Sequence, residues 1–255
     1  AVAAMISPKE TLVYYEELLN YIGHELDHDV ELIQRKTYSE VNELFPKRLI
    51  DLAFVCSGPY ANAKEKYEFE GIATPIVRGK PYYQSYLLVQ KNSPYHSFND
   101  LKGKVFAFTD PDSNTGTLVP RFWLFQQDET PASYFERTTY TYSHDNSILA
   151  VAKGLVDGAT VDGHMWEYYN EKNPYFTAQT RIIKKSGPFG SPPLVASAFL
   201  DPQLKLKIQR IILSMHQTGK GSKLLESLMI ERFDRPKYEW YKNITDMYNQ
   251  LNRKE

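Results

Sequence analysis

The sequence predicts a two-lobed α/β protein, in which each lobe is a mostly parallel β-sheet flanked by helices. Three observations support this prediction: strand and helix patterns alternate over residues 1–60, the alternation restarts near Ser85, and extended segments near Ser85 and Leu194 can cross between lobes. We expect lobe 1 to comprise residues 1–86 and 195–255, and lobe 2 to comprise residues 87–194. Two crossing strands would form a hinge, which suits closure around a ligand.

The N-terminal part predicts three strand–helix pairs in succession. Ser7-Pro8-Lys9-Glu10 has a helix cap, a proline at the first helical position and a glutamate three residues after the cap. Thr37-Tyr38-Ser39-Glu40 repeats the capping box and places Tyr38 in the first turn of the second helix. The expected elements are, in order, strand 1–6, a helix from 7, strand 30–33, a helix from 37, strand 50–56 and a helix from 57.

The rest of the chain repeats this plan. The segments Leu49-Ile50-Asp51-Leu52-Ala53 and Leu155-Val156-Asp157-Gly158-Ala159 each follow a helix and resemble one another, as expected for two lobes of one design. The expected elements are strand 85–90, a short helix within 92–103, strand 104–108, helix 117–125, a helix from 144, strand 158–161, strand 194–198, a long helix from 201 and a helical end.

Composition excludes several classes of function. The 255 residues carry a net charge of -1, so no strong field attracts nucleic acid. No apolar run reaches the roughly 18 residues of a membrane helix. Cys56 is the single cysteine, which excludes an internal disulfide, and its apolar surroundings predict a buried thiol. His24 and Asp27-His28-Asp29 lie at a polar helix end, where a solvated cluster is favoured over a metal site. We expect no metal, no cofactor and no enzymatic chemistry.

The segment Asp110-Pro111-Asp112-Ser113-Asn114-Thr115-Gly116 is the most informative candidate for a binding site. It joins a buried strand to a helix, so it presents free backbone N–H groups at the positive end of the helix dipole. The hydroxyls of Ser113 and Thr115 flank these groups. The segment therefore suits a small anion without any cation, although short polar residues are also ordinary helix caps.

This segment, continued by Thr117-Leu118-Val119-Pro120, resembles the DPxSxSGxLVP signature of periplasmic phosphonate-binding proteins, the binding components of phosphonate, phosphite and phosphate ABC transporters. Other pieces that resemble the family follow in its order: Ser7-Pro8-Lys9-Glu10-Thr11, Thr37-Tyr38-Ser39-Glu40-Val41, Ser57-Gly58-Pro59-Tyr60, Tyr83-Gln84-Ser85-Tyr86, the loop 97–103, His144-Asp145-Asn146-Ser147 and Val156-Asp157-Gly158-Ala159. The resemblance extends to about Leu200 and implies a type II periplasmic-binding-protein fold.

Carried over position by position, the resemblance implies that the oxyanion is bound by Tyr38, Tyr83, Ser113, Asn114, Thr115 and His144. Tyr38 and Tyr83 would reach the ligand from lobe 1, and the others from lobe 2. Tyrosine hydroxyls and a histidine N–H suit this role because they donate hydrogen bonds to oxyanion oxygens. The alternatives are packing roles for the two tyrosines and a helix-cap role for His144.

Two departures from the family bear on the ligand. Where members that bind aminophosphonates place carboxylates, this chain has His164 and Ser191-Pro192-Pro193. An ammonium tail would lack its charge partner, so phosphate, phosphite or a small neutral-tailed phosphonate is the expected ligand. Asp162 would either accept a proton from a protonated oxyanion or only cap the turn.

The resemblance implies a periplasmic or otherwise extracytoplasmic binding protein that closes around its ligand like a Venus flytrap and delivers it to an ABC permease, possible membrane anchoring being outside the sequence given. The alternative is a ligand-sensing domain of a signalling receptor, such as a histidine kinase, with a signalling domain as its partner. An enzyme on this fold would need a base in the site, for which only His144 or His164 is suited.

Overall fold

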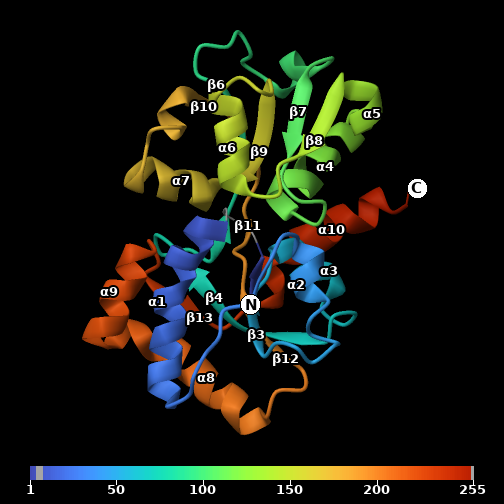
Figure 1. Ribbon diagram of the computed structural model, residues 1–255. Helices are drawn as coiled ribbons and strands as arrows, with labels where there is room; N and C mark the ends of the chain where they lie inside the picture. Colours follow the sequence, from blue (N-terminus) through green and yellow to red (C-terminus); the bar gives the residue numbers. More distant parts are fainter. Residues whose placement is uncertain (4–7, 254–255) are drawn as a thin grey trace. The chain divides into compact units, whose positions relative to one another are not determined.

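The computed structural model describes residues 1–3 and 8–253, and the chain divides into two compact units. Unit 1 comprises the first strand with Pro8–Tyr82 and Phe189–Asn243, and unit 2 comprises Tyr83–Pro188 with the C-terminal turns from Ile244 onward (Figure 1). The expected cap at Ser7 lies outside the described residues. The boundaries follow Tyr82 and Pro188, whereas the sequence led us to expect them after residues 86 and 194.

Unit 1 contains a six-stranded sheet in the order β13-β4-β12-β3-β1-β2. Its strands are β1 (Val2–Ala3), β2 (Gln34–Arg35), β3 (Leu52–Phe54), β4 (Phe69–Ile76), β12 (Leu194–Ser197) and β13 (Arg232–Asp234). Its helices are α1 (Pro8–Leu26), α2 (Tyr38–Asn42), α3 (Ser57–Ala63), α8 (Pro202–Ser214), η4 (Met215–Gln217), α9 (Gly219–Ser227) and η5 (Tyr238–Trp240). Helix α10 (Lys242–Leu251) begins in unit 1 and continues into unit 2.

Unit 2 contains a five-stranded sheet in the order β10-β6-β9-β7-β8. Its strands are β6 (Ser85–Gln90), β7 (Val105–Phe108), β8 (Arg137–Tyr140), β9 (Gly158–Asp162) and β10 (Thr180–Lys185). Its helices are η1 (Phe98–Leu101), the π-helix η2 (Asn114–Leu118), α4 (Val119–Phe125), α5 (Pro131–Tyr134), α6 (His144–Ala152), α7 (Gly163–Lys172) and η3 (Thr177–Gln179). Where the chain passes between units, β5 (Tyr82–Tyr83) pairs with β11 (Phe189–Gly190).

Both sheets are mixed, which corrects the expectation of mostly parallel sheets. Strands β1, β2 and β3 are parallel, as are β7, β8 and β9, but β12 runs antiparallel to β3 and β6 runs antiparallel to β9. Ser85, at the start of β6, pairs with Asp162, at the end of β9. The crossing chain thus enters the unit 2 sheet at the carboxyl edge of its parallel strands, and from there it can only run antiparallel.

Most elements expected from the sequence are confirmed, and one strand is wrong. The capping box of Thr37 and Glu40 is present, β6 has its expected bounds, and Cys56 is buried. The strand expected at residues 30–33 instead occurs at Gln34–Arg35, where β1 supplies hydrogen-bond partners for its backbone. The β-branched side chain of Val30 favoured a buried strand in the sequence, but this side chain is 37% exposed in the structure.

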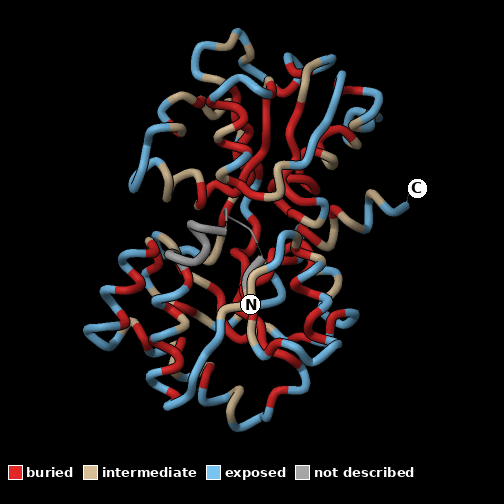
Figure 2. Tube along the Cα trace, viewed as in Figure 1, coloured by how far each residue is buried: buried red, intermediate tan, exposed pale blue. Residues whose placement is uncertain are grey.

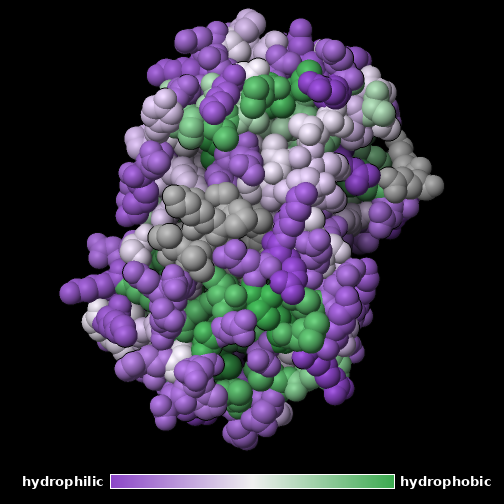
Figure 3. Space-filling view, in the orientation of Figure 1, coloured by the Kyte–Doolittle hydropathy of each residue, from purple (hydrophilic) through white to green (hydrophobic). Residues whose placement is uncertain are grey.

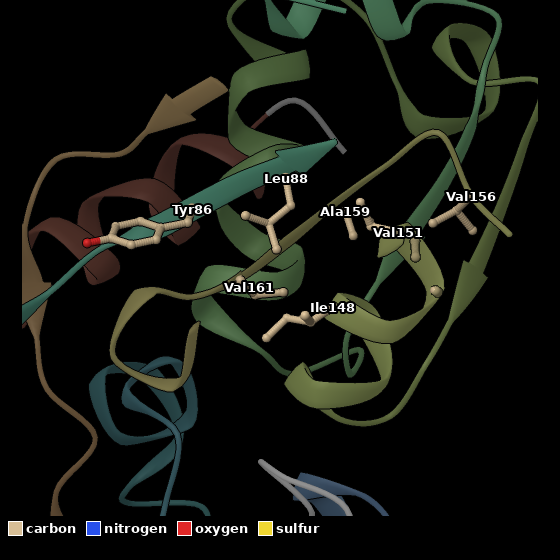
Figure 4. Close-up of a cluster of buried hydrophobic side chains, with 9 residues drawn as sticks. Tyr86, Leu88, Ile148, Val151, Val156, Ala159 and Val161 are labelled. Carbon is tan, nitrogen blue, oxygen red and sulfur yellow. The ribbon is translucent and has the colours of Figure 1, made fainter. Parts of the chain in front are cut away.

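A hydrophobic cluster fixes the elements that carry the candidate site in unit 2. Figure 4 shows Ile148 and Val151 of α6 packed against Ala159 and Val161 of β9, and each of these residues is buried. The three central strands of the sheet, β6, β7 and β9, are largely buried as well (Figure 2). Complete burial of an aliphatic side chain contributes about 1.5–3 kcal/mol. The cluster therefore holds the start of α6 beside the end of β9.

The surface of unit 1 carries a separate apolar feature. Figure 3 shows apolar side chains gathered on its visible face, where a hollow of about 330 Å³ is lined mainly by α1, α8 and the segments before β2 and β3. None of the expected ligand-binding residues lines this hollow. Within residues 1–3 and 8–253, no helix combines the length and the apolar character required to cross a membrane.

Candidate functional site

The carboxyl edge of the unit 2 sheet gathers most of the expected binding residues. Strand β7 leads into η2, which carries Asn114 and Thr115, and β9 leads through Asp162 into α7. His144 is the first residue of α6. The starts of three helices therefore meet at the ends of two neighbouring parallel strands, which is where α/β proteins bind ligands.

The turn between β7 and η2 forms a cradle of hydrogen-bond donors. The Ser113 hydroxyl caps the helix by accepting a hydrogen bond from the Gly116 N–H at 3.0 Å. A Cβ on Gly116 would lie 2.4 Å from the Thr109 hydroxyl oxygen, so only glycine permits this tight turn. The Thr115 side chain is almost fully buried, yet its hydroxyl bonds to no described residue. The cradle thus retains an unused donor at a helix start.

His144 is a buried, neutral hydrogen-bond donor. Its Nδ1 accepts a hydrogen bond from the backbone N–H of Asp162 at 3.1 Å, so the ring proton resides on Nε2. Burial lowers the pKa of His144 to about 3, which keeps the ring uncharged at neutral pH. The helix cap is Ser143, whose hydroxyl accepts from the Asn146 N–H, so the structure excludes the cap role considered for His144.

Asp162 caps α7 and is itself almost completely buried. One carboxylate oxygen, Oδ1, accepts hydrogen bonds from the backbone N–H groups of His164 at 2.8 Å and Met165 at 3.2 Å. Burial raises the pKa of Asp162 to about 7, despite these two hydrogen bonds, which lower it. The cap role of Asp162 is therefore real, and its carboxyl group nevertheless titrates in the physiological range.

Tyr83, Asn114 and His164 form a second group beside the cradle. The Asn114 side-chain Nδ2 donates to the Tyr83 hydroxyl at 3.0 Å, and the Tyr83 ring centroid lies 6.1 Å from that of His164. Tyr83 thus belongs to unit 2, with the cradle of hydrogen-bond donors, whereas we expected it in lobe 1 with Tyr38. The reason is that the chain crosses before Tyr83 rather than after Tyr86.

Three supporting residues of the site were not predicted. The Ser85 hydroxyl donates to the Thr115 carbonyl at 2.6 Å, and the Thr160 hydroxyl donates to the Gly116 carbonyl at 3.2 Å. The Thr109 hydroxyl lies 3.3 Å from Nδ1 of His144. The hydrogen-bond partners of Ser85 and Thr160 are distant in the chain, so the sequence could not reveal them. The one feature that could have indicated a role for these residues is a hydroxyl group on a strand expected to be buried.

Unit 1 holds the remaining expected residues. Tyr38 is buried as the first residue of α2, after the Thr37 cap. Ser191 is fully buried between β11 and β12, and its hydroxyl oxygen has no hydrogen-bond partner among the described residues. Its backbone is fixed, since its N–H donates to the Pro81 carbonyl and its carbonyl accepts from the Tyr241 hydroxyl at 2.9 Å. No carboxylate occurs in the segment 191–193.

Metal-binding clusters are absent from the part of the chain that the structure describes. Within it, no three histidine, cysteine or acidic side chains lie close enough together to hold a metal ion. His24, Asp27 and His28 border an open, polar depression at the end of α1. The cradle itself carries hydroxyl, amide and neutral imidazole groups.

Comparison with known proteins gives a consistent family. Residues 1–241 match the family model described as ABC transporter, phosphonate, periplasmic substrate-binding protein. The phosphonates-binding periplasmic protein of Escherichia coli is 32% identical over 159 residues, 61% of this chain and 47% of that protein. The probable ABC transporter phosphite binding protein PhnD1 of Prochlorococcus marinus is 24% identical over 184 residues, 67% of this chain and 62% of that protein. This chain thus spans about half to three fifths of these relatives.

A solved structure shows the same fold. The structure of PhnD1 from Prochlorococcus marinus in complex with methylphosphonate superposes with a TM-score of 0.87 at 21% identity, covering 98% of this chain and 97% of that one. The two-lobed type II periplasmic-binding-protein fold expected from the sequence is therefore confirmed.

Proposed function

Because this chain belongs to the family of periplasmic substrate-binding proteins of phosphonate ABC transporters, we propose that it binds a small phosphorus oxyanion and delivers it to an ABC permease. The ligand is phosphate, phosphite or a small phosphonate with a neutral tail. Relatives named for phosphonates and phosphite, and one bound to methylphosphonate, support this ligand class. The family is one of binding proteins, in line with the expectation that no chemistry is performed.

One observation supports this function most strongly: the cradle donors are neutral, buried and already oriented. Ser113 holds the helix start in place, the Thr115 hydroxyl has no hydrogen-bond partner among the described residues, and His144 carries its proton on Nε2. Oriented donors in a buried site bind an anion strongly because few groups must reorganise. We propose that these three residues donate hydrogen bonds to the oxyanion oxygens.

The tyrosines and Asn114 complete the proposed site. The Tyr83 hydroxyl accepts a hydrogen bond from Asn114 in unit 2, and we propose that this hydroxyl also contacts a ligand oxygen. From unit 1 we propose Tyr38, which is buried in the first turn of α2 directly after the Thr37 cap. The resemblance to the family aligns His164 and the segment 191–193 with positions near the ligand tail, and neither carries a carboxylate.

A panel of ligands tests the function. Thermal shift followed by calorimetry compares phosphate, phosphite, methylphosphonate, 2-aminoethylphosphonate and sulfate on one protein batch. We expect at least one of the first three to stabilise the protein and to bind with the highest affinity. The absence of binding by every phosphorus oxyanion would contradict the proposed function.

A further inference from the structure

Asp162 lies against the oxyanion cradle, with half of its carboxyl group unused. Alternation along β9 places Thr160 and Asp162 on one face of the strand and Ala159 and Val161 on the other. On its face, Thr160 contacts the cradle through the Gly116 carbonyl, and Ser85, which pairs with Asp162, contacts it through the Thr115 carbonyl. The cap of α7 uses Oδ1, whereas Oδ2 has no hydrogen bond to a described residue.

Within residues 1–3 and 8–253, no cation acts on the pKa of Asp162 to hold its carboxyl group ionised. Among the described residues, the charged neighbour that acts on its pKa is Glu167, which raises it further. Glu167 accepts a hydrogen bond from the Tyr86 hydroxyl at 2.6 Å, and His144 is uncharged. In the part of the chain that the structure describes, the titratable groups near Asp162 and the cradle include Tyr83 on β5, Tyr86 on β6, Asp110 after β7, His144 on α6, and His164 and Glu167 on α7. Asp110 lies in the surroundings of Tyr140 together with Asp112, Arg121 on α4 and Tyr142.

A fully ionised oxyanion would meet a second negative charge here. The cradle offers dipoles and hydroxyls, which stabilise one negative charge, but nothing in it neutralises an oxyanion and an ionised carboxylate together. A single proton between Oδ2 and a ligand oxygen removes this conflict and forms a short, charge-assisted hydrogen bond. The proton can start on either partner, because both are acids near neutrality: the second pKa of a phosphate group is about 6.

We infer that Asp162 makes the site selective for oxyanions that can share a proton with its carboxyl group, so that phosphite, phosphate and small phosphonates bind and sulfate is excluded. This inference rests on the proposed function and deepens it. Sulfate has nearly the same size and shape but is a far weaker base than phosphite or phosphate, so it carries no proton to donate to Asp162 and accepts only a weak hydrogen bond from the protonated carboxyl group. The selectivity then depends on the proton that the ligand shares with Asp162, and not on the shape of the ligand.

Calorimetry at pH 8 in two buffers that differ in ionisation enthalpy measures the proton directly. We expect the wild-type protein to take up close to one proton per phosphite bound, and to bind sulfate at least about a hundred-fold more weakly than phosphite. In Asp162→Asn the amide can donate to either oxyanion. Proton uptake should therefore disappear, and the gap between phosphite and sulfate should narrow by about ten-fold or more.

Two further variants keep the test interpretable. Asp162→Ser retains a good helix cap without a carboxyl group, and it should also abolish proton uptake. Asp201→Asn alters an exposed aspartate that caps α8 by accepting from the Leu204 N–H at 2.9 Å, and it should change neither uptake nor selectivity. If phosphite binds without proton uptake, or if sulfate binds equally well to the wild type, the role of Asp162 is refuted. If no phosphorus oxyanion binds at all, the proposed function itself fails.

Discussion

Replacing Asp162 by Asn should change how the ligand-free protein responds to pH. The pKa of this carboxyl group is about 7 in the folded protein, against an ordinary value of 3.8. Between these values the folded state binds more protons at Asp162 than the unfolded state does, so the contribution of Asp162 to stability is greatest below about pH 4 and decreases as the pH rises. Each pH unit in this window removes about 1.4 kcal/mol, which gives a loss on the order of 4 kcal/mol by pH 8.

His144 produces the opposite dependence. Its pKa is lowered from 6.5 to about 3, so the folded state binds fewer protons in this window and loses stability as the pH falls through it. Between about pH 4 and 6.5 the two slopes have similar size and opposite sign, and in the wild type they nearly cancel. Asp162→Asn retains the α7 cap, because asparagine caps helices as well as aspartate does.

Urea denaturation between pH 4 and 8 measures this effect. The free energies of unfolding of the wild type and Asp162→Asn should be similar at pH 4, and the variant should be more stable by several kcal/mol at pH 8. Below pH 6.5 the variant should show the acid sensitivity of His144 alone, and His144→Asn should instead lose stability only as the pH rises. Asp201→Asn, with its exposed cap, is the control. A difference that stays constant with pH would refute this reasoning.

Three more predictions concern single side chains and the ligand tail. Thr115→Val should weaken binding of the best phosphorus oxyanion by roughly ten-fold to a hundred-fold in calorimetry with an unchanged melting temperature. Thr117→Val should lower the melting temperature, because the Thr117 hydroxyl donates to the Asp110 carbonyl at 2.7 Å. If Thr115→Val and Thr117→Val bound the oxyanion with equal affinity, the proposed role of the Thr115 hydroxyl in the cradle would be contradicted. Ser191→Ala removes a buried, unpaired hydroxyl and should raise the free energy of unfolding by about 1 kcal/mol; a loss of stability would show a hidden partner. Competition calorimetry should find 2-aminoethylphosphonate at least about ten-fold weaker than methylphosphonate, since His164 cannot neutralise an ammonium group, and the reverse order would place an acid near the tail.

Local chemistry in the sequence determined much of the secondary structure and the location of the turn between β7 and η2. Thr37 and Glu40 form a capping box without help from any distant residue. The hydrogen bond from the Gly116 N–H to the Ser113 hydroxyl is equally local. Such interactions span three residues, so they can be recognised without knowledge of the rest of the chain. The resemblance to the phosphonate-binding family joined these local pieces into one fold.

Only the tertiary structure decided which distant residues meet. The strand expected at residues 30–33 forms at Gln34–Arg35 because β1 pairs there, and β6 runs antiparallel because the crossing enters beside the end of β9. Tyr83 joins Asn114, and the neutrality of His144 and the raised pKa of Asp162 follow from burial under α6, α7 and the sheet. Burial and strand pairing depend on residues tens of positions apart, so they cannot be predicted from patterns among neighbouring residues.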